Sequence, residues 1–148
     1  MNWRPTWRGW KSTIISVRMA KLKVLVAEDN KSVQALYNLG LSDELYRKEF
    51  AANGEDALKL YDSWHPDVVI MDIMMPVLSG YNALKAIREK EKETGEHVTV
   101  IMATAMTDKN DIMDCAKLGI EGYIVKPFKH RELAGKIESY HANKRQKS

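Results

Sequence analysis

Hydrophobic and polar positions change their spacing repeatedly between Leu22 and His141. Short aliphatic runs in this part of the chain predict buried strands. Between them, apolar residues recur every three or four positions, which is the spacing of a helix that covers a core with one face. The predicted strands are 22–27, 46–52, 67–71, 98–103 and 122–125. The predicted helices are a segment of about ten residues after Asn30, then 57–64, 80–92, 108–118 and 131–141.

The dipeptide Asn53-Gly54 leaves one local choice, because it is a common hairpin turn. The apolar residues from Ala57 to Trp64 decide against a hairpin, since they are spaced as one helical face and His65-Pro66 ends the helix. A strand is therefore followed by a helix five times. Aliphatic strands that alternate with amphipathic helices predict the α/β class, with a doubly wound parallel sheet, helices on both faces and right-handed crossovers.

Composition fits one domain of this kind. The chain has 148 residues, of which 45% are hydrophobic and 29% charged, so it can bury a core without disulfides or a structural metal. Cys115 is the single cysteine, which excludes an intrachain disulfide and any zinc site with several thiolates. A reducing, cytoplasmic compartment is therefore expected. The longest apolar runs have the length of a strand, so we expect neither a membrane span nor membrane contact.

Charge is distributed unevenly along the chain. Residues 1–18 hold four basic residues and no acidic one, and residues 141–148 hold three basic residues. Residues 19–140 hold 16 basic and 20 acidic residues, a formal charge of −4. An acidic body without a basic stripe argues against direct DNA binding.

The same change of composition suggests domain boundaries. We expect an N-terminal extension at 1–18 that is disordered or not native, a domain at 19–142 and a basic tail at 143–148. Three tryptophans in the first ten positions recur at helical spacing, so an amphipathic helix that binds a surface is the alternative for the extension.

Polar residues stand directly after four of the five predicted strands. They are Glu28 and Asp29 after the first strand, Asp72 after the third, Thr104 after the fourth and Lys126 after the fifth. In a doubly wound sheet the ligand site lies beyond the carboxyl ends of the strands. Close carboxylates need a cation, and an all-oxygen set suits Mg²⁺. A lysine and a hydroxyl beside it suit a phosphoryl group, so the predicted chemistry is phosphoryl transfer onto a carboxylate.

From about Met19 to Tyr140 the chain resembles the receiver domain of two-component response regulators. The matching motifs, in order, are Glu28-Asp29, the segment 72–80 (DIMMPVLSG), Thr104-Ala105 and the segment 123–128 (YIVKPF). Each motif alone is weak, and the joint match is specific. The resemblance implies a flavodoxin-like, doubly wound, five-stranded parallel sheet of order 2-1-3-4-5, a (βα)5 chain with two helices on one face and three on the other.

The resemblance also implies a phosphoacceptor and a metal site. Asp72 would take a phosphoryl group from the phosphohistidine of a histidine kinase or a histidine phosphotransfer protein. Asp29, Asp72 and the backbone carbonyl of Met74 would bind Mg²⁺ directly, and Glu28 would act through water. Such a site needs positioning and charge neutralisation more than an acid or a base.

Further residues would bind the phosphoryl group and report its presence. The resemblance implies that Lys126, the Thr104 hydroxyl and the backbone amides of Met74 and Ala105 bind the phosphoryl oxygens. Thr104 and Tyr123 would then form a switch that remodels the surface of the last two helices and the strand between them. A downstream effector protein would read that surface.

Each of these residues also has a purely structural interpretation. Glu28-Asp29 could cap a helix, and Asp72 could be a turn residue. Lys126 could be a solvated loop lysine, although in the family the bond to Pro127 is cis, in keeping with a lysine that is directed at the site. Tyr123 could simply cover the edge of the sheet.

The sequence therefore predicts a phosphoacceptor signalling protein and no enzyme beyond phosphoryl acceptance and self-dephosphorylation. Few residues follow the last predicted helix, so we expect a stand-alone regulator of the chemotaxis type that contacts a protein partner; a phosphorelay intermediate and an adaptor stay open. A receiver-like interaction module that is never phosphorylated is the alternative class. A flavodoxin is disfavoured because Glu28-Asp29 would repel the flavin phosphate. A haloacid-dehalogenase type hydrolase would need an aspartate where this chain has Met74.

Overall fold

The computed structural model describes residues 20–105 and 109–147. The expected extension at 1–18 lies outside the described residues. The five strands are β1 (Leu22–Ala27), β2 (Tyr46–Ala51), β3 (Val68–Asp72), β4 (Thr99–Ala105) and β5 (Gly122–Lys126). The helices are α2 (Lys31–Gly40), α3 (Gly54–Trp64), α4 (Gly80–Thr94), α5 (Lys109–Leu118) and α6 (His130–Lys147).

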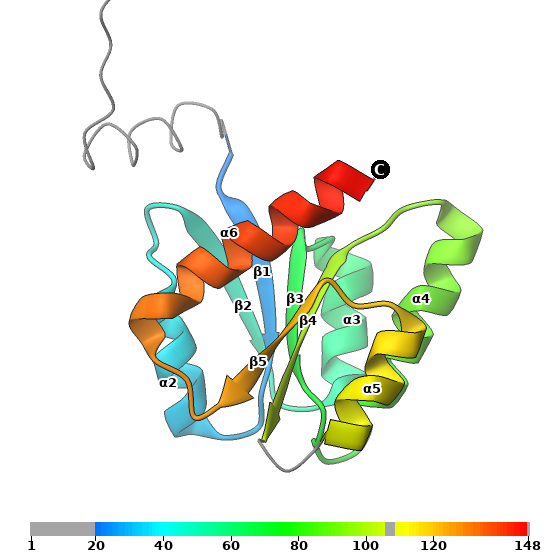
Figure 1. Ribbon diagram of the computed structural model, residues 1–148, viewed down its shortest axis with the longest axis horizontal. Coiled ribbons are helices and arrows are strands. Elements are labelled where there is room, and N and C mark those ends of the chain that lie inside the picture. Colours follow the sequence, from blue (N-terminus) through cyan, green and yellow to red (C-terminus); the bar gives the residue numbers. More distant parts are fainter. Residues whose placement is uncertain (1–19, 106–108, 148) are drawn as a thin grey trace, which may run out of the picture.

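The strands form one parallel sheet of order β2-β1-β3-β4-β5, which confirms the predicted flavodoxin-like order. Helices α2 and α6 cover one face, and α3, α4 and α5 cover the other (Figure 1). All five carboxyl ends therefore lie at one edge, the lower edge in Figure 1. The polar residues that follow the strands in the sequence were predicted to meet at this edge.

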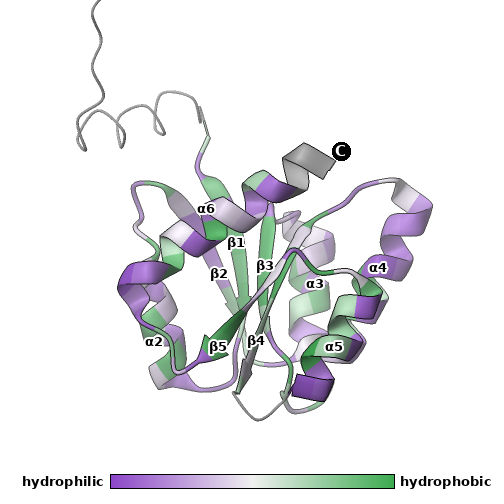
Figure 2. Ribbon diagram, in the orientation of Figure 1, coloured by the Kyte–Doolittle hydropathy of each residue, from purple (hydrophilic) through white to green (hydrophobic). Residues whose placement is uncertain are grey.

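Two apolar layers, one on each side of the sheet, form the core. Along β1, Leu25 and Ala27 face α3 and α4, whereas Val24 and Val26 face α2 and α6. Both sets are buried, as expected of a parallel strand that is covered on both faces. Figure 2 shows green along the central strands β1 and β3 and a mixture of green and purple along the helices. Within residues 20–105 and 109–147, no helix combines the length and the apolar character needed to cross a membrane.

Asparagine side chains begin the first two helices. The Asn30 side chain accepts hydrogen bonds from the backbone amides of Ser32 and Val33 at 2.9 and 3.1 Å, and thereby caps α2. Asn53 caps α3 in the same way, by accepting from the Asp56 amide at 2.8 Å. The dipeptide at 53–54 is thus a helix start and not a hairpin turn, as the helical spacing after it predicted.

Several element boundaries differ from those predicted, and two of the differences bear on the site and on the C-terminal segment. Strand β3 is shifted by one residue and includes Asp72, because the parallel pairing with β4 continues beyond the aliphatic run and joins Asp72 to Ala103. Helix α6 was predicted to end at His141 but runs to Lys147, and so takes in most of the segment expected as a basic tail. No glycine or proline follows His141, and most of the remaining residues are good helix formers.

Candidate functional site

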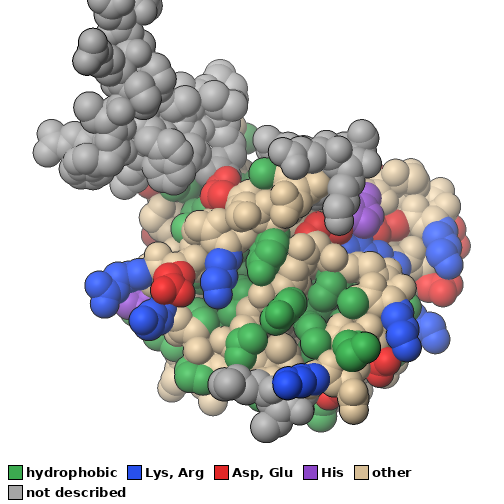
Figure 3. Space-filling view, viewed as in Figure 1, with side chains coloured by type: hydrophobic (Ala, Val, Ile, Leu, Met, Phe, Trp, Pro, Cys, Tyr) green, Lys and Arg blue, Asp and Glu red, His purple; other side chains and the backbone are tan. Residues whose placement is uncertain are grey.

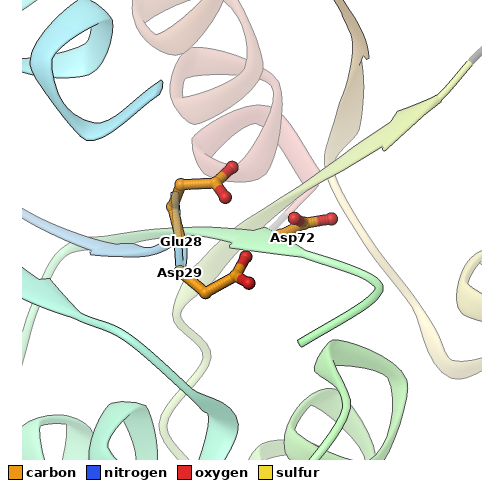
Figure 4. Close-up of side chains that lie close together, drawn as sticks. All are labelled: Glu28, Asp29 and Asp72. Atoms are coloured by element: carbon orange, nitrogen blue, oxygen red, sulfur yellow. The ribbon is translucent and has the colours of Figure 1, made fainter. Parts of the chain in front are cut away.

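The ends of β1 and β3 bring three carboxylates together. These strands pair in parallel, with Ala27 beside Met71, so Glu28 and Asp29 leave β1 where Asp72 ends β3. One carboxylate oxygen from each of the three side chains lies within 4.8 Å of the others. Figure 4 shows the three side chains grouped around the same space at the end of the sheet.

Lys126, on the edge strand β5, forms ion pairs with two of these carboxylates. It ends β5, two strands away from β3. Its Nζ donates hydrogen bonds to Oε1 of Glu28 at 2.8 Å and to Oδ2 of Asp72 at 2.9 Å. Lys126 is therefore an ion-pair partner within the site and not a solvated loop residue. The peptide bond to Pro127 is cis, as the resemblance implied.

Burial makes the charges of this cluster consequential. Glu28 is 1% and Asp72 8% exposed, while Asp29 is exposed. Burial raises the pKa of Glu28 above its ordinary value, and hydrogen bonds from Lys126 and the Asn30 amide offset this only in part. Burial lowers the pKa of the Lys126 ammonium, but its hydrogen bonds to Glu28 and Asp72 outweigh burial, so its pKa lies above the ordinary value.

The structure separates the metal-site interpretation of Glu28-Asp29 from the capping interpretation. Asn30 caps α2, so neither acid is needed for that purpose. Three carboxylates against one ammonium leave a formal charge of −2 at a site that is mostly buried. The three carboxylates each offer an oxygen within 4.8 Å of the others, and an all-oxygen donor set suits a hard divalent cation.

The backbone after β3 also contacts the acceptor candidate. The Met74 amide donates to Oδ1 of Asp72 at 3.3 Å, which places this turn against the carboxylate. The Gly80 amide donates to the Ile73 carbonyl at 2.8 Å and closes the turn where α4 begins. A Cβ on Gly80 would lie 2.0 Å from the Asp72 carbonyl oxygen, so only glycine allows α4 to approach β3 this closely.

Two supporting residues were not among the predicted site residues. Gly80 belongs to the motif at 72–80, and a glycine at a helix start is a signal of close backbone approach. Gln34 donates from Nε2 to the Glu28 carbonyl at 2.5 Å and holds the turn after β1. Nothing in the sequence singles out Gln34 for this contact.

Thr104 lies near the carboxyl end of β4, beside β3, and Tyr123 lies on the edge strand β5. Thr104 is buried next to Ala103, the register partner of Asp72, and its hydroxyl donates to the Ala105 carbonyl at 3.1 Å. Tyr123 lies on edge strand β5 with its side chain half exposed. Its backbone carbonyl accepts from the Tyr140 hydroxyl of α6 at 3.2 Å.

Known proteins resemble this chain over most of its length. The family model described as the response regulator receiver domain matches residues 24–138. A protein of Porphyridium aerugineum named probable transcriptional regulator ycf27 is 40% identical over 121 residues, which are 82% of this chain and 48% of that protein. The transcriptional regulatory protein AfsQ1 of Streptomyces coelicolor is 30% identical over 116 residues, 78% of this chain and 49% of that protein. The chain spans about half the length of the curated relatives it matches.

Solved structures share the fold at similar coverage. The chemotaxis response regulator CheY4 of Vibrio cholerae has a TM-score of 0.73 and 29% identity, over 82% of this chain and 99% of that one. The structure of a CheX-CheY-BeF3-Mg complex from Borrelia burgdorferi has a TM-score of 0.71 and 27% identity, over 80% of this chain and 87% of the matched one.

Proposed function

Because the chain belongs to the response regulator receiver domain family of two-component signalling, we propose that Asp72 is its phosphoacceptor. The observation that carries this proposal is the double hydrogen bond of Lys126 to Glu28 and Asp72. It directs an ammonium to the acceptor carboxylate before any phosphoryl group is present. Such preorganised charge is what a phosphoryl transfer site needs most.

In the proposed reaction, a carboxylate oxygen of Asp72 attacks the phosphorus of a phosphohistidine. A P–O bond forms, the P–N bond breaks, and the histidine ring of the kinase or phosphotransfer protein leaves and takes up a proton. Lys126 then exchanges its bond to Asp72 for the phosphoryl oxygens. The Met74 amide already points at Asp72 and remains available to an oxygen of the transferred group.

Mg²⁺ is the proposed cofactor, and Glu28, Asp29 and Asp72 would hold it. When bound, it neutralises charge that builds up on the phosphoryl oxygens. The excess of two negative charges at a mostly buried site supports this assignment. The carbonyl of Met74 is proposed as a further ligand from the resemblance, and the hydrogen bond of the Met74 amide to Asp72 keeps this residue in the turn beside the site.

Phosphorylation is proposed to change the surface formed by α5, β5 and α6. Figure 3 shows hydrophobic side chains gathered over β5 and towards α5, with basic side chains around them. Met113 on α5 and Tyr123 on β5 are among the exposed apolar residues. A Thr104 hydroxyl that turns to the phosphoryl group would free space into which Tyr123 can turn. An effector protein that prefers one Tyr123 position would thereby sense the phosphoryl group.

The output is proposed to be contact with an effector protein. Relatives named transcriptional regulators support a role in gene regulation, and neighbours named chemotaxis proteins support a role of that type. The acidic body of residues 19–140 disfavours direct DNA contact by this domain. A cytoplasmic location is proposed on the basis of the lone cysteine. Beyond phosphoryl acceptance and self-dephosphorylation, no enzymatic activity is proposed.

The test is phosphorylation of the purified chain by acetyl phosphate, followed by intact-mass and peptide analysis. We expect one phosphoryl group on Asp72, dependent on Mg²⁺ and abolished by EDTA. Asp72→Asn should remove it, whereas Asp62→Asn, which changes an exposed acid on α3, should not. Modification that persists in Asp72→Asn, or in EDTA, would exclude this assignment. A chain that binds its partner equally well with and without acetyl phosphate would favour the unphosphorylated interaction module.

A further inference from the structure

Four of the five methionines in residues 20–105 and 109–147 fall into two groups, and the fifth, Met75, is partly buried against the core. Met71 and Met102 are 0% exposed and belong to the core, whereas Met74 is 65% and Met113 60% exposed. The thioether of an exposed methionine is open to oxidants and contributes little to packing. Exposure alone therefore predicts that Met74 and Met113 react with a small oxidant well before the two core methionines.

Met74 differs from Met113 in what its backbone contacts. The Met74 amide donates to Oδ1 of Asp72 at 3.3 Å, whereas Met113 lies on the surface of α5. Met74 also lines a cavity of about 250 Å³ together with Ile73, Ser79 and Tyr81. The Met74 backbone is therefore hydrogen-bonded to the proposed acceptor carboxylate, and its side chain has open space around it.

We propose that Met74 is an oxidation site through which an oxidant shortens the lifetime of the phosphoryl group on Asp72. The sulfur takes one oxygen atom from hydrogen peroxide, which leaves as water, and methionine sulfoxide is the product. The sulfur is oxidised by two electrons and the peroxide is reduced by two. The effect on lifetime rests on the proposed function, whereas the oxidation itself does not.

The chemical consequence follows from the change in polarity. A thioether is at best a weak hydrogen-bond acceptor, while a sulfoxide oxygen is a strong one. The methionine side chain has three rotatable bonds, so a sulfoxide anchored beside Asp72 can reach a water molecule next to the phosphoryl group. Hydrolysis requires that water in line with the bond that breaks, and misplacement by about 1 Å costs on the order of a hundredfold. A flexible side chain that orients the water part of the time should therefore accelerate hydrolysis about tenfold.

The experiment uses the full chain, its Met74→Leu variant and its Met113→Leu variant as a matched control. Each protein is treated with hydrogen peroxide, and peptide mass spectrometry follows all eight methionines. Each is then phosphorylated with acetyl phosphate and Mg²⁺, and the loss of the phosphoryl group after donor removal is compared with that of its own untreated sample. Methionine sulfoxide reductases provide the reverse step.

We expect Met74 and Met113 to be oxidised before Met71 and Met102. Peroxide should shorten the phosphoryl lifetime of the natural chain and of Met113→Leu about tenfold, and should leave the ratio near one in Met74→Leu. Restoration by the reductases should return the original lifetime. Oxidation of Met113 without Met74, or a shortened lifetime that persists in Met74→Leu, overturns the proposal. An untreated chain that accepts no phosphoryl group overturns the proposed function, and this inference with it.

Discussion

Replacing Gly80 with alanine should displace the backbone that carries Asp72, the proposed phosphoacceptor. The added Cβ would lie 2.0 Å from the Asp72 carbonyl oxygen and 2.8 Å from its carbonyl carbon. Both are backbone atoms of a buried central strand, so no flexible side chain can yield. Because Cβ atoms do not approach other atoms below 3.0 Å, α4 and the end of β3 must separate by about 1 Å or more.

The expected loss of stability follows from that geometry. Overpacking that moves backbone costs about 1–3 kcal/mol, and a contact this short against a strand belongs at the upper end, about 3 kcal/mol. Gly135 provides the control, because it lies inside α6 and a Cβ there meets nothing within 4 Å. Alanine at that position should stabilise the protein by about 0.5–1 kcal/mol through its better helix propensity. The two substitutions therefore have opposite signs and differ by about 4 kcal/mol.

Urea unfolding at 25 °C, followed by circular dichroism, measures the difference. The midpoint should fall for Gly80→Ala and rise for Gly135→Ala, with similar slopes. Phosphorylation by acetyl phosphate gives an independent readout, since a shift of about 1 Å at Asp72 should slow it by up to about a hundredfold. Free energies of unfolding that agree within about 0.5 kcal/mol for the two variants would show that the contact at Gly80 is readily relieved.

Two further predictions concern parts of the chain away from the site. Arg88 donates to the buried carboxylates of Glu91 at 2.6 Å and Glu121 at 3.2 Å, so Arg88→Met should cost about 3–5 kcal/mol. As a control, Lys90→Met breaks the exposed ion pair of Lys90 with Asp62 and should lower the free energy of unfolding by less than about 1 kcal/mol. Equal losses of stability for the two variants in urea unfolding would contradict this prediction. Burial raises the pKa of the Cys115 thiol from 9.0 to about 11, with help from nearby aspartates. The folded state thus holds that proton more tightly, and about 2–3 kcal/mol of stability present below pH 9 should be lost towards pH 11. In Cys115→Ala, the loss of folding stability between pH 9 and pH 11 should be smaller by that amount. A loss equal to that of the natural chain would contradict this prediction.

The sheet could be predicted because its central strands are largely aliphatic on both faces. Runs such as Val68–Met71 leave no polar face to turn towards water, which requires helices on both sides and excludes an exposed antiparallel sheet. The order of the strands came from the resemblance and not from this pattern. Boundaries were less predictable, since hydrogen bonding continues where apolarity stops. Asp72 joins β3 through its pairing with Ala103, and α6 continues past its last apolar contact because nothing ends it.

The candidate site was predictable only to the level of strand ends. Glu28, Asp29 and Asp72 could be expected at one edge because parallel strands share their carboxyl edge. That Lys126 bonds both Glu28 and Asp72 depends on contacts across 98 and 54 residues of sequence, and no local pattern carries that information. A glycine at the start of a helix signals a close backbone approach, but only the structure shows that the backbone approached by α4 at Gly80 is that of Asp72.

Strand order explains why Thr104 is placed to respond to the acceptor. Lys126 on β5 must reach over the end of β4 to bond Asp72 on β3, and Thr104 lies at that end of β4. Its hydroxyl has one proton, which is now donated to the Ala105 carbonyl at 3.1 Å. A phosphoryl group on Asp72 would compete for that proton with a charged oxygen, a stronger acceptor than a neutral carbonyl. Because Ala105 is the register partner of Lys126, the released carbonyl would lie beside the residue proposed to bind the same phosphoryl group. Phosphorylation of Asp72 would thus alter contacts at the ends of both β4 and β5, and β5 is the strand that carries Tyr123 on the proposed signalling surface.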